Sequence, residues 1–221
     1  MMNLLAIDTS TDIASLALQV GDDCLYKEQA SQKTHANLIL PLIDGLLSEA
    51  AISLKQLDGI IFGSGPGSFT GLRIACSIAK GLAFGQEDLG LIPVNTLSAL
   101  TYGLRQQNKY SDHAVLAVLD ARMSQLYWSY FPKNEFLVTE QKVSAPQDII
   151  LPAGTSVVLA GLGGELYWDA FSEDLKTQIQ HKVKVYPSAV SMIGLALTCQ
   201  LKPIAPDQAH PIYVRNQVTH T

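Results

Sequence analysis

The sequence lacks several features that mark common protein classes. Only 3 of its 221 residues are cysteine, and none belongs to a C-x-x-C pair or has a histidine at ligand spacing. Such cysteines are typical of core thiols in a reducing compartment. The first residues contain no positive segment ahead of an apolar one, and no apolar run reaches the roughly 18 residues of a membrane span. We therefore expect a cytoplasmic protein that makes no membrane contact.

Charged residues are also scarce, at 16% of the chain, and the 15 Lys and Arg residues are scattered under a formal net charge of −5. No basic stripe that could follow a phosphate backbone is present. Any nucleic acid is therefore expected to be held only through a complex. The five histidines stand apart without an H-x-x-x-H or H-E-x-x-H pair, so no metal site is predicted.

What the sequence does have is abundant apolar surface, arranged in two similar halves. Hydrophobic residues make up 48% of the chain and the mean hydropathy is +0.18, which leaves apolar area for an interface. Hydrophobic periodicity predicts three strands and then alternating helices and strands, at 4–8, 14–20, 24–30, 34–51, 59–63, 68–84, 91–94 and 97–107. After Ser111 a second plan follows, with strands at 114–120, 126–131, 136–141, 157–160 and 182–186, and helices at 164–171 and 188–200.

The two halves predict an α/β protein with an internal repeat, in which Asp8 and Asp120 each end a first strand. We expect a first lobe over residues 1–108 and a second lobe over 109–221, with the boundary near 108–112. The proline-rich end of the chain should form an extended tail packed on a lobe.

One turn of the first lobe could hold a phosphate. Asp8, Thr9 and Ser10 follow the first strand, and an acidic residue with hydroxyls on a tight turn can hold a metal-bound phosphate. The commoner role of such residues is to satisfy the amides of the turn.

A second candidate turn lies between a buried strand and a helix, and it contributes Gly65 and Gly67. Backbone amides at a helix start attract anions. The run does not match G-x-G-x-x-G or a P-loop. A turn with Ser68 as the helix N-cap explains most of the same pattern.

The helices predicted over 34–51 and 68–84 are unusually apolar. The second is apolar on nearly all sides, which is typical of a helix buried all round. Its Gly71, Ala75 and Ala79 lie four apart and would let another helix approach closely. It can be a core helix or an interface helix, and the leucine-rich helix beside it favours an interface with a second chain.

Residues for hydrolytic catalysis are not evident. Ser64 does not fit a G-x-S-x-G nucleophile elbow, because Pro66 occupies the second position after it. Asp120 with Arg122 could be a catalytic acid and its partner, and a turn ion pair is the commoner arrangement. No catalytic residue is therefore predicted.

Five segments resemble the TsaB family of bacterial proteins, also called YeaZ, which is related to the TsaD/glycoprotease-like proteins. The segments are L-L-A-I-D-T-S-T, T-H-A-N-L-I-L-P-L-I, G-S-G-P-G-S-F-T-G-L-R-I-A, I-P-V-N-T-L-S-A-L and, in the tail, P-I-Y-V-R. The resemblance is specific over residues 3–100, adds Tyr213 and Arg215, and is loose between Tyr110 and Pro203. It implies the duplicated actin-like ATPase fold shared with sugar kinases, of the ribonuclease H-like type, with a reduced second lobe.

The resemblance also implies a subunit of the machinery that makes threonylcarbamoyladenosine beside the anticodon of tRNAs. The catalytic paralogue, TsaD, has a metal-binding histidine pair after the strand that I-P-V forms here. Thr96 and Leu100 stand at the corresponding positions, and they cannot replace two imidazoles. The chain is therefore expected to be a non-catalytic partner that binds and activates TsaD.

By resemblance, the two apolar helices pair with TsaD, and the ATPase TsaE engages the pair. The same face would form a homodimer when TsaD is absent, since an apolar face prefers any cover to water. No tightly bound cofactor is expected, and ATP or ADP would bind at the interface of the complex. The expected contact residues are His35, Leu38, Leu42, Leu46, Phe69, Leu72, Arg73 and Cys76.

Two other functions stay open. The two candidate phosphate turns on an actin-like fold would suit a small ATPase or phosphotransferase, which requires tight nucleotide binding by the isolated chain. A peptidase, an older label of this family, would need a nucleophile and a base in reach of one another, and the sequence offers no such pair.

Overall fold

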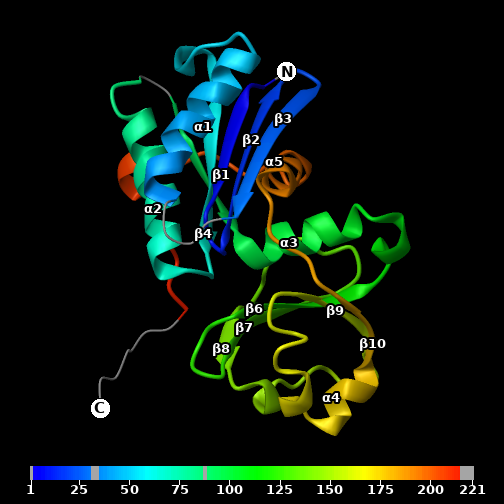
Figure 1. The fold of residues 1–221 in the computed structure, drawn as a ribbon. Helices are drawn as coiled ribbons and strands as arrows, with labels where there is room; N and C mark the ends of the chain where they lie inside the picture. The colour runs from blue at the N-terminus through cyan, green and yellow to red at the C-terminus, as the bar shows by residue number, and fades with distance from the viewer. Residues whose placement is uncertain (1, 31–34, 87–88, 215–221) are drawn as a thin grey trace.

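The computed structural model describes residues 2–30, 35–86 and 89–214. Its strands form two five-stranded sheets, one in each of two lobes (Figure 1). The first sheet has the order β3-β2-β1-β4-β5, from β1 (Leu4–Asp8), β2 (Ile13–Val20), β3 (Asp23–Ala30), β4 (Gly59–Gly65) and β5 (Leu91–Asn95). The second has the order β10-β9-β6-β7-β8, from β6 (Ala114–Asp120), β7 (Leu126–Phe131), β8 (Lys142–Ser144), β9 (Val157–Gly161) and β10 (Ile179–Val183).

Both sheets are wound in the same way. β1 pairs antiparallel with β2 and parallel with β4, and β6 pairs antiparallel with β7 and parallel with β9. The outer strands repeat the pattern, since β2–β3 and β7–β8 are antiparallel while β4–β5 and β9–β10 are parallel. Asp8 and Asp120 each end the central strand of their sheet. The predicted duplicated, actin-like α/β plan is confirmed.

The second repeat is the shorter version of this plan. In the first, α1 (His35–Glu49) lies between β3 and β4, and α2 (Phe69–Ala83) lies between β4 and β5. In the second, the 3-10 turn Pro146–Asp148 lies between β8 and β9, and the six-residue α4 (Glu173–Gln178) precedes β10. The second lobe is thus reduced, as the resemblance implied.

The last helix of each repeat packs on the sheet of the other repeat. α3 (Thr96–Arg105) follows β5, yet its leucines share a core with Val115, Ala117 and Leu119 of β6. α5 (Ala189–Thr198) follows β10 and packs on β1, β2 and β4. α5 lies within the predicted second lobe, 109–221, but it packs on the first sheet, and a helical pattern does not show which sheet a helix covers. The boundary near 108–112 stays a prediction.

Glycines set the close crossing of α3 and α5. A Cβ on Gly103 would lie 2.5 Å from the Ser191 hydroxyl oxygen, and one on Gly194 would lie 2.6 Å from the Tyr102 ring. Either Cβ would force a neighbouring side chain or helix to shift. The two exchanged helices, and with them the two lobes, are therefore held together through glycine contacts.

Two predicted elements of the second lobe are wrong. Residues 136–141 form no strand, and the third strand of the repeat is the later β8. Residues 164–171 contain only a 3-10 turn at Trp168–Ala170, and α4 begins after them, with Ser172 as its N-cap. The apolar spacing of 164–171 reflects Tyr167 and Trp168 packing against the second core, which the pattern alone cannot distinguish from a helix.

Helices α1 and α2 lie on one face of the first sheet, and α5 covers the other (Figure 1). α1 runs through Pro41, which is exposed. Within this chain α2 is buried on one side and exposed on the other, so of the two arrangements left open by the sequence it is not a core helix covered all round by its own chain. Its small residues Gly71, Ala75 and Ala79 face the chain's own sheet, so they bring that sheet close and offer no seat for another helix. The outer face of α2 exposes larger side chains. Among the helices described, none combines the length and apolar character that crossing a membrane requires.

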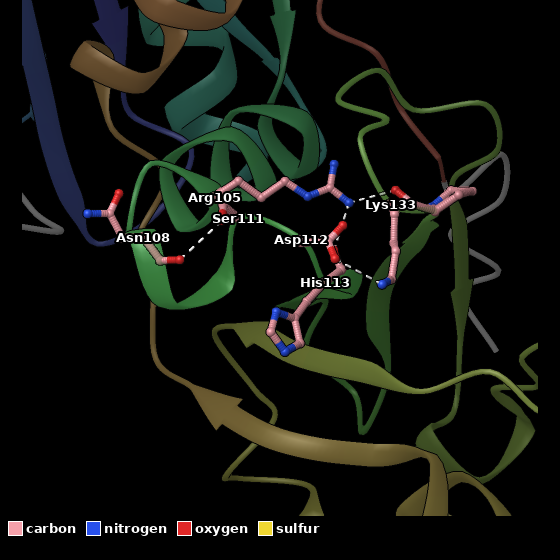
Figure 2. Close-up of polar contacts among 7 residues, drawn as sticks. Arg105, Asn108, Ser111, Asp112, His113 and Lys133 are labelled. Carbon is pink, nitrogen blue, oxygen red and sulfur yellow. Dashed lines mark hydrogen bonds and ion pairs between the residues drawn. The ribbon is translucent and has the colours of Figure 1, made fainter.

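A buried arginine fastens the end of α3 to the second lobe (Figure 2). The Arg105 guanidinium donates to the carbonyl oxygens of His113 and Pro132, at 3.0 and 2.6 Å, and also to that of Glu135. Nearby, Lys133 pairs with Asp112 at 3.2 Å. Arg105, a planar cation that serves several acceptors at once, therefore joins the end of α3 to the start of β6 and to the β7–β8 connection, and the Lys133–Asp112 pair ties the predicted lobe boundary to the same connection.

Candidate functional site

The glycine-rich turn between β4 and α2 is a capped helix start. The Ser68 hydroxyl accepts a hydrogen bond from the amide of Gly71 at 3.2 Å, which confirms the predicted N-cap. The turn packs on the β1–β2 turn, because the Ser68 amide donates to the Ser10 carbonyl oxygen at 2.7 Å. The Thr9 hydroxyl in turn donates to the Gly71 carbonyl oxygen at 2.6 Å. The two candidate phosphate turns are thus bonded to each other.

Glycine is needed in this turn for the approach of the chain's own backbone. A Cβ on Gly71 would collide with the carbonyl oxygen of Thr9, and one on Gly67 would lie 2.5 Å from that of Ser10. Gly65 has a φ of +115°, and its Cβ would lie 2.8 Å from the Ile212 carbonyl oxygen. The glycines are thus explained by packing, without a bound phosphate.

Asp8 is fully buried beneath these turns. Its carboxyl accepts from the Ser10 hydroxyl at 2.9 Å and from the Ser10 amide at 3.3 Å. Burial raises the pKa of Asp8 to about 7, although the Ser10 hydrogen bonds act in the opposite direction. A Cβ on Gly63 would collide with this carboxyl. The structure thus brings Asp8, Thr9, Ser10 and the glycines together, and the side chains of Asp8 and Thr9 form hydrogen bonds within this group. Nucleotide binding at these residues stays a prediction.

Between the lobes lies a cleft of about 1430 Å³. Ser10 and the glycine turn line one wall, and Asp120, Arg122 and Lys182 line the other. The Asp120 carboxyl accepts from the Arg122 amide at 2.8 Å, as Asp8 does from Ser10, and it pairs with the Arg122 guanidinium at 3.3 Å. This pair has the arrangement of a turn ion pair, the commoner of the two interpretations offered by the sequence.

Ser64 has no arrangement suited to a nucleophile. It is buried, and its hydroxyl donates to the carbonyl oxygen of Val94 at 3.1 Å. Its own carbonyl oxygen accepts from the amide of Ile212. Ser64 therefore fastens β5 and the tail to β4.

The positions matched to metal ligands in TsaD lie in the interior. Thr96 and Leu100 are both fully buried, and Leu100 belongs to the core between α3 and the second sheet. Among the residues that the structure describes, the Thr96 hydroxyl has no hydrogen-bond partner. In the part of the chain that the structure describes, no group of three His, Cys, Asp or Glu residues could hold a metal ion.

The predicted partner-contact residues divide by burial. Leu46, Leu72 and Cys76 are buried within this chain, so their side chains are covered here, and their contact with a partner stays a prediction. Leu38 and Leu42 are half-buried. The side chain of His35, like Arg215 in the tail, lies outside the described residues.

Phe69 and Arg73 are exposed on α2, as an interface role requires, and sequence reasoning missed three other residues of the same face. Leu40 on α1 is 51% exposed and Phe84, at the end of α2, is 87% exposed. Tyr213 reaches α2 from the tail and accepts a hydrogen bond from Arg73 Nε at 2.9 Å. The resemblance marked Tyr213 but gave it no role, because its partner lies 140 residues away.

Sequence comparisons with known proteins agree on the family of this chain. The profile of the family described as TsaD, tRNA N6-adenosine threonylcarbamoyltransferase, matches residues 28–202. A Haemophilus influenzae protein named tRNA threonylcarbamoyladenosine biosynthesis protein TsaB is 34% identical over 99% of this chain and 95% of its own. The Escherichia coli protein of the same name is 31% identical over 98% and 96%.

Solved structures agree with these sequence matches. YeaZ from Pseudomonas aeruginosa superimposes with a TM-score of 0.83 and 30% identity, over 96% of this chain and all of that one. A second Pseudomonas aeruginosa structure, described as similar to the peptidase YeaZ, gives 0.84 and 29% over 97% and 100%. The chain belongs to the TsaB family of tRNA threonylcarbamoyladenosine biosynthesis proteins, within the wider group that the TsaD profile describes.

Proposed function

We propose that this chain is a non-catalytic partner subunit that binds and activates the TsaD transferase in making threonylcarbamoyladenosine beside the anticodon of tRNAs. The observation that carries the proposal is the outer face of α1 and α2, on which Leu40, Phe69 and Phe84 are exposed. Removing such apolar area from water is the main driving force of association. The names of the relatives place the family in the pathway.

The interior supports the non-catalytic part of this proposal. Leu100 is a core residue where TsaD supplies a metal ligand, and Asp8 is buried with a raised pKa. A carboxyl with a pKa of about 7 is only about half ionised at neutral pH, which makes it a poorer ligand for a metal-bound phosphate than an ordinary carboxylate. The metal-dependent transfer is therefore assigned to TsaD.

The family resemblance implies further partners, which belong to the same proposal. When TsaD is absent, a second copy of the chain covers α1 and α2, which gives a homodimer. TsaE engages the pair of subunits, and ATP or ADP binds at the interface of the complex, not tightly to this chain alone. tRNA is held through the complex.

The test is the exchange of one exposed leucine. Leu40→Glu places a charge on the proposed face without disturbing the core, and should weaken binding to TsaD by roughly 10-fold or more and reduce tRNA modification in parallel. Ile150→Glu is the matched control, because Ile150 is 81% exposed and lies between β8 and β9 of the second sheet. Both variants are compared by calorimetric titration with TsaD. Unchanged binding of the Leu40 variant, or modification that persists without binding, contradicts the proposal.

The alternative ATPase or phosphotransferase is tested by titrating ATP into the isolated chain. The mutual packing of the two candidate phosphate turns argues against it. The peptidase alternative is disfavoured by the buried, hydrogen-bonded Ser64.

A further inference from the structure

Arg73 is exposed on α2, where it also lines the cleft between the lobes, and two aromatic residues hold its guanidinium. The guanidinium carbon lies 3.8 Å from the centroid of the Phe69 ring and 5.8 Å from that of Tyr213. The two rings are 5.3 Å apart, and Arg73 Nε donates to the Tyr213 hydroxyl at 2.9 Å. We call Phe69, Arg73 and Tyr213 the arginine clamp. It gives a long and otherwise rotatable side chain one orientation.

The tail delivers Tyr213 to this place through backbone contacts. The Ile212 amide donates to the carbonyl oxygen of Ser64 at 2.7 Å, and Gly65 leaves room for the Ile212 carbonyl. Earlier in the tail, the Ala209 carbonyl oxygen accepts from Lys80 Nζ at 3.0 Å. The tail is therefore fastened along α2 independently of the Tyr213 side chain, which serves to orient Arg73.

The clamp leaves most of the arginine's hydrogen-bonding capacity unused. A guanidinium carries five N–H donors, and Tyr213 occupies the one on Nε. Among the described residues, no carboxylate lies within ion-pair distance of Arg73. The sequence of α2 contains no Asp or Glu, and its other cation, Lys80, is turned to the tail. The clamp therefore presents an unmatched positive charge in a chain whose net charge is −5.

We propose that the arginine clamp is the recognition point for an acidic side chain of the partner protein that docks on α1 and α2. The carboxylate would accept two hydrogen bonds from Nη1 and Nη2 of Arg73, the end of the guanidinium that Tyr213 leaves free. This inference rests on the proposed function and names the chemistry of its interface. Tyr213 acts in it as a positioning residue.

A protein carboxylate fits the surroundings better than a phosphate of RNA. Phe69 is 54% exposed, Ile212 45% and Tyr213 42%, so the cation is set in apolar surface. Arginine with aromatic neighbours is the composition of hot spots in protein interfaces. A backbone of phosphates would need several free cations side by side. Arg122, Lys182 and Lys184 line the cleft with Arg73, but Arg122 is paired with Asp120, and the two lysines lie over the rings of Trp168 and Tyr186.

The test is calorimetric titration of the full chain with TsaD at low and moderate salt. Arg73→Ala should weaken binding about 10- to 100-fold, and Arg73→Lys should recover little of it because lysine has no fork. Tyr213→Phe keeps the ring and removes the hydroxyl, and should cost roughly 3- to 10-fold. The wild-type affinity should fall with salt more steeply than that of Arg73→Ala. Lys133→Ala, which removes an exposed cation from the second lobe, should bind like the wild type.

The outcomes separate this inference from the proposed function. If the wild type itself does not bind TsaD, the proposed function is wrong. If the wild type binds and Arg73→Ala, shown to be folded by circular dichroism, binds equally well, only the clamp is wrong. Full recovery by Arg73→Lys contradicts a bidentate contact. Loss of tRNA binding by the complex with TsaD binding intact would identify the anion as a phosphate and overturn the proposal.

Discussion

The buried Asp8 makes the stability of this protein depend on pH in a way that a single substitution should remove. In the unfolded chain its pKa is close to the ordinary value of 3.8, and in the fold burial raises it to about 7. The fold therefore favours the protonated form. The stability contribution of this group is fully present below about pH 4 and is lost as the pH rises to about 7.

The magnitude follows from the size of the shift. A difference of about 3 pKa units between the folded and unfolded states corresponds to roughly 4 kcal/mol of unfolding free energy. Asp8→Asn keeps an oxygen for the Ser10 amide and adds an NH₂ that can donate to the Ser10 hydroxyl, while removing the charge. The gain of the variant over the wild type should therefore be about 2–3 kcal/mol larger at about pH 8 than at about pH 5.

Urea unfolding followed by circular dichroism at these two pH values measures the difference. Asp12→Asn is the control, because it makes the same exchange at an exposed position of the same β1–β2 turn. Equal stability differences at both pH values, or a variant less stable than the wild type at the higher one, would refute the reasoning.

The structure makes three further predictions. Gly71→Ala should destabilise the fold by about 3 kcal/mol or more, because its Cβ would collide with the Thr9 carbonyl oxygen. Gly81→Ala lies in open space on the same helix and should stabilise the fold by roughly 0.5–1 kcal/mol. Thermal melting of both variants checks this. Arg105→Lys should destabilise by about 2 kcal/mol, since one ammonium cannot serve three carbonyls with the geometry of the planar fork, and unchanged urea unfolding would contradict this. Ser64→Ala should leave TsaD-dependent tRNA modification intact in a reconstituted assay, and its loss there would revive a chemical role for this hydroxyl.

Much of the fold follows from local sequence. The alternation in residues 4–30 and its recurrence after Ser111 predicted both meanders, because an exposed or buried face repeats at every second residue of a strand. Ser68 was identified as a helix cap for a similarly local reason. Elements whose form depends on distant packing were not predicted. Residues 164–171 have the apolar spacing of a helix, but they pack against the second core without forming one. Nothing in the sequence of α5 indicates that it packs on the first sheet.

In the candidate site, too, local features were predicted and contacts between distant residues were not. The sequence placed Phe69 and Arg73 on an interface helix, and both are exposed. It could not separate them from Leu72 and Cys76 on the same helix, because an apolar residue on nearly every side hides which side faces the sheet. Tyr213 completes the clamp from the far end of the chain, a contact that no local pattern can predict.

The measurement that tests the central proposal most directly is threonylcarbamoyladenosine formation in a reconstituted system, with this chain and TsaD supplied separately and together. We predict no modified tRNA from this chain without TsaD, little from TsaD without this chain, and full formation with both, which falls when Leu40→Glu replaces the wild type. Modification by this chain without TsaD, or full modification by TsaD in its absence, would contradict the proposal.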